Sequence, residues 1–173
     1  KRVCRYLVGL QRMVFHYKWQ ILEHAAVYID TDRAGCPRTR KSTSGGCVIL
    51  GTPAVKSGSS MQAGVALSSG EVEFNGVVRG AGVGLGYQSL LRDLGFNVNL
   101  RVWTTSPAAI GLCTRQGLGK LRHLDTHTLR VEQAVRSKRL DLRKAAGEVN
   151  PADLFSNYSL TRERLIGPTT LFE

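Results

Sequence analysis

The sequence contains no apolar run that approaches the roughly 18 residues of a membrane-spanning helix, and no signal peptide is visible. We therefore expect no membrane partner. Hydrophobic residues make up 42% of the 173 residues, which lies outside the range of disordered chains. This length is sufficient for one domain with a sizeable core.

Cysteine is scarce, and its spacing is not that of a metal site. Cys4, Cys36, Cys47 and Cys113 form no C-x-x-C pair, and no histidine pair lies at zinc-ligand distance from them. A zinc site is therefore not expected. We predict free, mostly buried thiols in a reducing compartment, which leaves the cytoplasm, the nucleus or an organelle matrix.

Acidic residues are also few. The chain has 13 acidic and 24 basic residues, a formal net charge of +11. This excess favours a polyanionic partner, of which nucleic acid is the commonest. The basic residues are spread along the chain, which indicates a broad phosphate-contacting surface; ordinary solvated faces are the alternative.

The order of apolar segments and breakers predicts an α/β domain. Within residues 25–66 we expect three antiparallel strands, at Val27–Ile29, Gly45–Leu50 and Ala54–Val65. A long helix at 69–94 with a Ser68 or Ser69 cap follows, then a strand at 99–104 and a helix opened by Ser106 and Pro107. His123–Arg139 is predicted as a helix with Leu129 and Val135 facing inward, Leu140–Ala145 as a strand, and Asn150 and Pro151 as the start of a last helix.

The helix predicted at 69–94 is unusually rich in glycine. Gly76, Gly80 and Gly84 are spaced by four and share one face, where they would let another backbone pack closely; a kinked or frayed helix is the alternative. The run is not a dinucleotide-binding fingerprint, because its third glycine has the wrong spacing and no strand precedes it.

Two carboxylates follow the first predicted strand. In the stretch from Val27 to Gly35, the apolar residues lead directly into Asp30 and Asp32. A buried carboxylate needs a partner, and a divalent metal is one such partner. A turn that uses Asp for local hydrogen bonds is the equally simple alternative.

Further motifs follow in order: RKSTSGG at 40–46, VALSSGEVEF at 65–74, TTSPAAI at 104–110, RHLD at 122–125 and NPADL at 150–154. Together with the stretch around Asp30, this ordered set resembles the ribonuclease H domain of copia-type retrotransposon polyproteins. The resemblance covers about residues 1–160. It implies a degenerate, retrotransposon-derived copy.

The resemblance implies a ribonuclease H-like α/β fold, with a mixed central sheet of three antiparallel strands and then further strands, flanked by helices. It divides the chain into a remnant of the polymerase connection at 1–22, the ribonuclease H-like domain at 23–160 and a C-terminal extension at 161–173. No polymerase is part of this sequence.

Ribonuclease H enzymes hold two magnesium ions, about 4 Å apart, with four acidic residues. By motif position, three of these catalytic and metal-binding carboxylates are Asp30, Glu73 and Asp153, with Glu71 a weaker choice than Glu73. Thr105 occupies the place of the remaining Asp. A neutral hydroxyl cannot supply that charge, and nothing in the sequence supports compensation by Asp32.

The resemblance also suggests nucleic-acid-binding residues, namely Arg33, Arg38, Arg40, Lys41, Lys120, Arg122 and His123. For His123 and Asp125, a helix cap is an equal alternative. We predict a non-catalytic or severely impaired ribonuclease H-like domain that acts as an RNA-binding or structural subunit, and a large ribonucleoprotein containing other proteins is a setting that would suit it. It would need no bound cofactor. The alternatives are an active, Mg²⁺-dependent ribonuclease H that cleaves RNA in RNA–DNA hybrids, and a decayed fragment.

Overall fold

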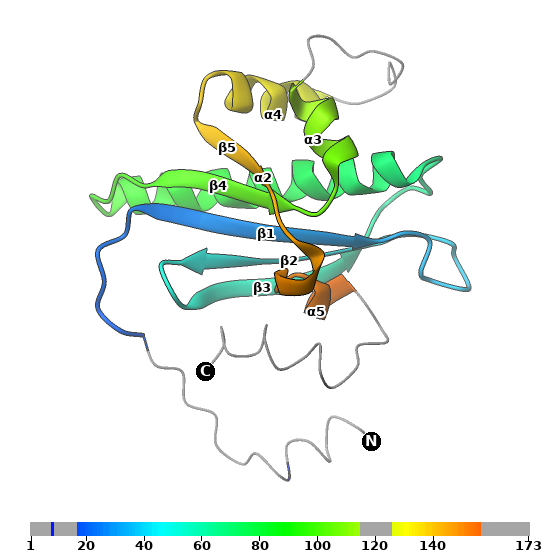
Figure 1. Cartoon of the computed structure of the whole chain (residues 1–173), viewed down its shortest axis with the longest axis horizontal. Coiled ribbons are helices and arrows are strands. Elements are labelled where there is room, and N and C mark those ends of the chain that lie inside the picture. The colour runs from blue at the N-terminus through cyan, green and yellow to red at the C-terminus, as the bar shows by residue number, and fades with distance from the viewer. Residues whose placement is uncertain (1–7, 9–16, 115–125, 157–173) are drawn as a thin grey trace.

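The computed structural model describes residue 8 and residues 17–114 and 126–156. A five-stranded sheet lies at the centre, in the order β3-β2-β1-β4-β5 (Figure 1). Its strands are β1 (His24–Asp32), β2 (Thr43–Leu50), β3 (Ala54–Met61), β4 (Asn99–Thr104) and β5 (Leu140–Lys144). The predicted connection at 1–22 is thus described only in part and the extension at 161–173 not at all, so both boundaries stay predictions.

The sheet is mixed, as the sequence predicted. β1 pairs antiparallel with β2, and β2 pairs antiparallel with β3. On its other side β1 pairs in parallel with β4, and β4 pairs in parallel with β5. The central strand β1 is mostly buried on both faces, which explains its nearly continuous apolar sequence.

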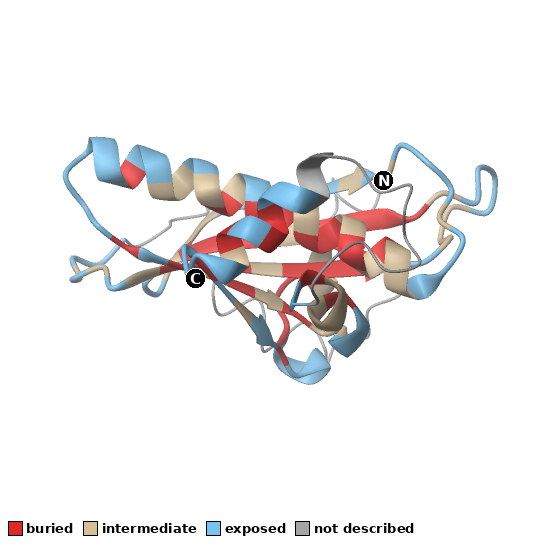
Figure 2. Ribbon diagram, turned by 90° about the horizontal axis from the view of Figure 1, so that it is seen from above, coloured by how far each residue is buried: buried red, intermediate tan, exposed pale blue. Residues whose placement is uncertain are grey.

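One long helix, α2 (Ser69–Asp93), covers one face of the sheet (Figure 2). Ser68 caps it, because the Ser68 hydroxyl accepts a hydrogen bond from the backbone N–H of Glu71 at 3.2 Å. Gly76, Gly80 and Gly84 do share one face, as predicted. They admit side chains of the underlying strands: a Cβ on Gly76 would lie 2.5 Å from Thr31 Cγ2.

The remaining helices are α3 (Pro107–Thr114), α4 (Thr126–Arg136), the short 3₁₀ turn η1 (Gly147–Val149) and α5 (Asp153–Ser156). The Ser106 hydroxyl caps α3 by accepting from the Ala109 N–H at 3.2 Å, as predicted. Asn150 caps the turn into α5, but the helix itself begins at Asp153, so the placement of Pro151 at its first position was wrong.

Two predictions about α4 were wrong. The helix ends at Arg136 and not at Arg139, because Lys138 has a φ of +55°, which breaks the helical backbone. Leu129 is 49% exposed; Val131 and Ala134 are buried apolar residues of this helix, while Val135 packs against the core as expected. Residues 123–125 lie outside the described part.

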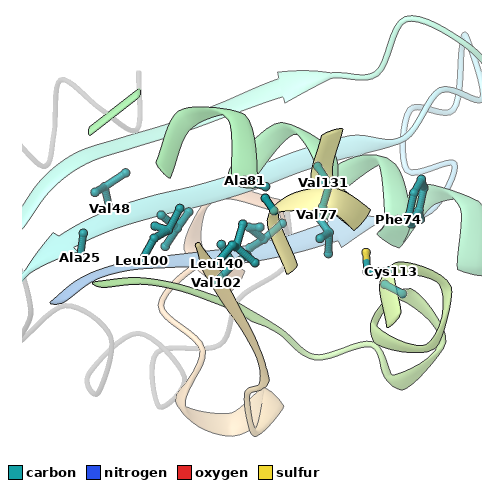
Figure 3. Close-up of a cluster of buried hydrophobic side chains, with 14 of the residues drawn as sticks. Ala25, Val48, Phe74, Val77, Ala81, Leu100, Val102, Cys113, Val131 and Leu140 are labelled. Atoms are coloured by element: carbon teal, nitrogen blue, oxygen red, sulfur yellow. The ribbon is translucent and has the colours of Figure 1, made fainter. Parts of the chain in front are cut away.

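The main core lies between the sheet and the layer of α2, α3 and α4 (Figure 3). On the opposite face a smaller cluster around Cys47 includes Phe155 of α5. Beside it the rings of Tyr28 and Trp103 stack with centroids 5.8 Å apart, and the Arg143 guanidinium lies 5.6 Å from the Trp103 ring.

Cys47 and Cys113 are buried free thiols, Cys36 is half-buried, and Cys4 is outside the described residues. No helix in the described ranges is long and apolar enough to span a membrane.

Candidate functional site

The ends of β1 and β4 bring two of the predicted positions together. These strands are parallel, and Ile29 of β1 is in register with Thr104 of β4. The next residue of each strand, Asp30 and Thr105, therefore lies at the same edge of the sheet. Asp30 is buried, at 9% exposure, and Thr105 is half-buried. Thr105 thus follows β4 at the edge of the sheet where Asp30 lies, and its correspondence to the aspartate of the motif stays a prediction.

The first turns of α2 place Glu73 over this edge. Because Gly76 has no side chain, this part of the helix packs directly on Thr31 of β1. The pKa of Glu73 is raised to about 7, chiefly by burial; the Thr31 hydroxyl opposes the rise, and the nearby charge of Asp30 adds to it. Neither Glu73 Oε2 nor Thr31 Oγ1, both buried, has a partner at hydrogen-bond geometry. Glu73 is therefore a carboxyl held in an apolar setting next to a second carboxyl.

Glu71, the weaker sequence choice, has a different role. Its Oε2 accepts a hydrogen bond from the backbone N–H of Leu67 at 2.9 Å, just before the helix begins. Its own N–H binds the Ser68 cap. This is a reciprocal arrangement at a helix N-terminus, where an acidic side chain also favours the helix dipole. The structure therefore favours Glu73 over Glu71 as the carboxylate that faces Asp30.

The segment that carries Asp153 is tied to β1 from the opposite face. Asn150 is 1% exposed; its Nδ2 donates to the Ile29 carbonyl at 3.1 Å, and its Oδ1 accepts from the Ala152 N–H at 3.2 Å. At the end of α5, the Ser156 hydroxyl donates to Asp30 Oδ2. Asp153, half-buried, begins this short helix. Sequence reasoning missed Ser156, since no pattern marks a serine three residues after an Asp.

A second carboxyl beside Asp30 is Asp32. Burial raises its pKa, and the charge of Asp30 raises it further. Asp30 therefore interacts with both Glu73 and Asp32. Sequence reasoning had found no support for compensation by Asp32, and the structure shows only that the two carboxyls repel each other.

The predicted carboxylates fit a two-metal site poorly. Within residues 17–114 and 126–156, no three His, Cys, Asp or Glu side chains are close enough to share an ion. Asp30 and Glu73 interact, Thr105 contributes no charge, and one Asp30 oxygen is engaged by Ser156. Two divalent ions require more negative charge than this to balance them. Asp30 and Glu73 are the residues of this edge that would hold a divalent cation.

A basic loop follows the carboxylates. We use this name for residues 33–42, which connect β1 to β2. Arg33, Arg38 and Arg40 are exposed and Lys41 is half-buried. The loop is ordered locally, since the Ala34 N–H donates to the Ser42 hydroxyl at 3.0 Å. The other predicted nucleic-acid-binding residues, namely Lys120, Arg122 and His123, lie outside the described part of the chain.

Comparison with known proteins identifies the fold. No family profile matches the sequence, and no curated protein matches it. Among solved structures, LC11-RNase H1, isolated from compost by a metagenomic approach, is similar with a TM-score of 0.58 and 14% identity over 77% of this chain and 92% of that one. The N-terminal RNase H domain of Rv2228c from Mycobacterium tuberculosis gives a TM-score of 0.50 and 16% identity over 78% and 91%. The chain therefore has a ribonuclease H-like fold, as the motifs predicted.

Proposed function

We propose that this ribonuclease H-like domain binds RNA or an RNA–DNA hybrid through its basic loop and carboxylate edge, and that it hydrolyses the bound strand poorly or not at all. The observation that supports the proposal is the register of β1 with β4, in which Ile29 pairs with Thr104, so that Asp30 and the neutral Thr105 come next at the same edge of the sheet. The copia-type origin belongs to the same proposal and is supported by the ordered motifs.

Charge supports the binding half of the proposal. The chain carries a net charge of +11, and the basic loop, with its three exposed arginines, follows directly after Asp32. A strand lying along this edge would meet cations at its phosphates. Association with other proteins in a ribonucleoprotein stays a prediction.

Charge also supports the loss of hydrolysis. Magnesium is held in proteins by a few ionised carboxylates together with water and substrate phosphates. Here the third position is neutral, and the pKa of Glu73 is raised to about 7, so that Glu73 is partly protonated at neutral pH before any cation binds. An approaching cation therefore meets a weak field.

One observation favours residual hydrolysis as a second candidate function. Asp30 and Glu73, on different elements, lie close enough for the charge of one to shift the pKa of the other. A single cation held by this pair would supply Lewis-acid chemistry at a phosphate. The two candidates are separated by measuring cleavage.

The cleavage test uses a labelled RNA–DNA hybrid with magnesium or manganese. We expect no cleavage above that of Asp30→Asn, and a gain of at least tenfold in Thr105→Asp that disappears in Thr105→Asp/Asp30→Asn. If the unaltered chain cleaves the hybrid and Asp30→Asn abolishes that cleavage, the proposal that hydrolysis is impaired is refuted. A Thr105→Asp variant that binds hybrid but gains nothing would refute the assignment of Thr105.

The binding test follows the same hybrid by fluorescence anisotropy over a range of salt concentrations. Each phosphate contact contributes about 0.9 to the slope of log K against log salt. Arg33→Ala and Arg38→Ala should each lower this slope by roughly that amount. Arg92→Ala is the matched control, because Arg92 is exposed in the last turn of α2, at the far end of that helix from Glu73. Equal effects at all three positions would mean that binding does not involve the basic loop.

A further inference from the structure

A groove separate from the carboxylate edge lies between α2 and the two outer strands β2 and β3. At this level of the sheet Ile29 of β1 pairs with Gly46 of β2, and Gly46 pairs with Gly58 of β3. A side chain is therefore present on β1 and absent from the next two strands. Gly76 and Gly80 of α2 line the same space. We call this space, of about 140 Å³, the glycine groove.

The volume of the glycine groove sets the size of what it can hold. An engineered apolar cavity of about 150 Å³ binds benzene. The groove, at 140 Å³, therefore has room for one six-membered ring. Its walls include the apolar side chains of Ile29, Val48 and Val83, and backbone forms the floor at Gly46 and Gly58. A planar ring fits these surfaces.

The charge of the lining determines what the ring should carry. Lys56 of β3 and Arg79 of α2 both line the groove and are exposed. No acidic side chain is among the lining residues, and among the described residues neither cation forms an ion pair. Two uncompensated cations beside a ring-sized apolar space complement a ligand with one ring and an anionic group.

We propose that the glycine groove binds a pyrimidine nucleotide, with the ring between α2 and the floor of β2 and β3 and the phosphate at Lys56 and Arg79. A free mononucleotide and one nucleotide of a single strand would both supply this ring and phosphate. The site goes beyond the proposed function and does not depend on it, because none of its lining residues belongs to the basic loop or is one of the candidate carboxylates.

Gly58 offers a direct test. A Cβ at this position would meet no atom within 4 Å, so Gly58→Val should fold while its side chain fills the groove. Gly82→Ala is the matched control, since a Cβ on Gly82 also meets nothing and Gly82 is not part of the lining. Thermal unfolding of both variants verifies that each is folded.

The measurement is a titration of the full chain with uridine monophosphate, followed through the backbone amide signals of the groove glycines. We expect saturable shifts at Gly46, Gly58 and Gly80, with a dissociation constant of about 1 mM or tighter. Gly58→Val should weaken binding at least tenfold, and Lys56→Gln and Arg79→Gln at least fivefold each. Gly82→Ala should change it less than twofold.

Three results would overturn the proposal. They are unchanged binding in folded Gly58→Val, equal binding of adenosine monophosphate, and equal binding of inorganic phosphate, which would show that no ring enters the groove. A parallel titration with tetrauridylate distinguishes a single strand from a free nucleotide as the ligand. If it shifts the same glycines more tightly than the mononucleotide, the natural ligand is a strand; if it leaves them unshifted while the mononucleotide binds, the ligand is a free nucleotide. Loss of hybrid binding in the Arg33→Ala and Arg38→Ala variants, with these shifts intact, would concern only the proposed function.

Discussion

Gly45 controls how closely α5 approaches the sheet. It lies in β2, where it pairs with Asp30 of β1. A Cβ at this position would lie 2.5 Å from the carbonyl carbon of Phe155 and 2.7 Å from the backbone nitrogen of Ser156. Backbone atoms cannot rotate away as a side chain can. Gly45→Ala must therefore move α5, and with it the hydroxyl that binds Asp30.

The expected cost has two parts. Overpacking a well-packed site destabilises a protein by about 1–3 kcal/mol. Replacing Gly by Ala recovers about 0.4–1 kcal/mol by restricting the unfolded chain. We therefore expect Gly45→Ala to lower the free energy of unfolding by about 1–2 kcal/mol, which corresponds to a fall in Tm of roughly 2–8 °C in a domain of this size.

Gly58→Ala is the matched control in the neighbouring strand of the same sheet. Its Cβ would meet nothing, so only the effect on the unfolded chain remains. We expect a gain of about 0.4–1 kcal/mol. Urea and thermal unfolding measure both variants, and amide exchange at Ser156 reports whether α5 is loosened. If Gly45→Ala proves as stable as Gly58→Ala and amide exchange at Ser156 is unchanged, the inference that α5 packs closely on β2 at Gly45 is wrong.

Three further predictions concern α2 and the carboxylates. The pKa of Glu73 is raised to about 7 in the folded protein. Its contribution to stability is therefore full below the ordinary Glu pKa of 4.5 and is lost as the pH rises through 7. The raised pKa of Asp32 changes stability in the same direction. Urea unfolding should show stability falling by about 1–2 kcal/mol between pH 4.5 and 8, since solvent screening reduces the effect of this partly exposed carboxyl. The fall should be smaller in Glu73→Gln; equal profiles would contradict the burial of this carboxyl. Ser68→Ala should cost about 0.5–2 kcal/mol by removing the cap of α2, and an unchanged unfolding midpoint would mean that the cap contributes nothing. Gly82→Ala should stabilise the helix by about 0.5–1 kcal/mol, whereas Gly80→Ala, whose Cβ would meet the Ile29 side chain, should be the less stable of the two in thermal unfolding.

Much of the fold follows from local pattern. The strand at Asn99–Thr104 was predicted with its observed bounds, and the helix at Ser69–Asp93 ends one residue earlier than expected. Turn residues, caps and apolar periodicity act over a few residues and are visible in the sequence. The mixed sheet was likewise predicted, because the order of elements together with the motifs indicates it.

Local pattern failed where packing decides. Leu129 has the residue type of a buried position but is 49% exposed, because Val131 and Ala134 occupy the face of α4 that meets the core. The end of the same helix is set by the left-handed backbone of Lys138, a conformation that the residue type does not indicate. The partner of a helix face and the conformation of one residue depend on the whole domain.

The sequence by itself determined which residue types are present at the candidate site, including a threonine where the motif has an aspartate. Only the tertiary structure decided how they meet. The register of β1 with β4, two strands separated by about 70 residues of chain, brings Asp30 and Thr105 to the same edge of the sheet. The glycines of α2 let the helix that carries Glu73 pack closely on β1. The physical reason is that pKa values and cation binding depend on distances between side chains. Those distances are fixed by long-range packing and not by spacing along the chain.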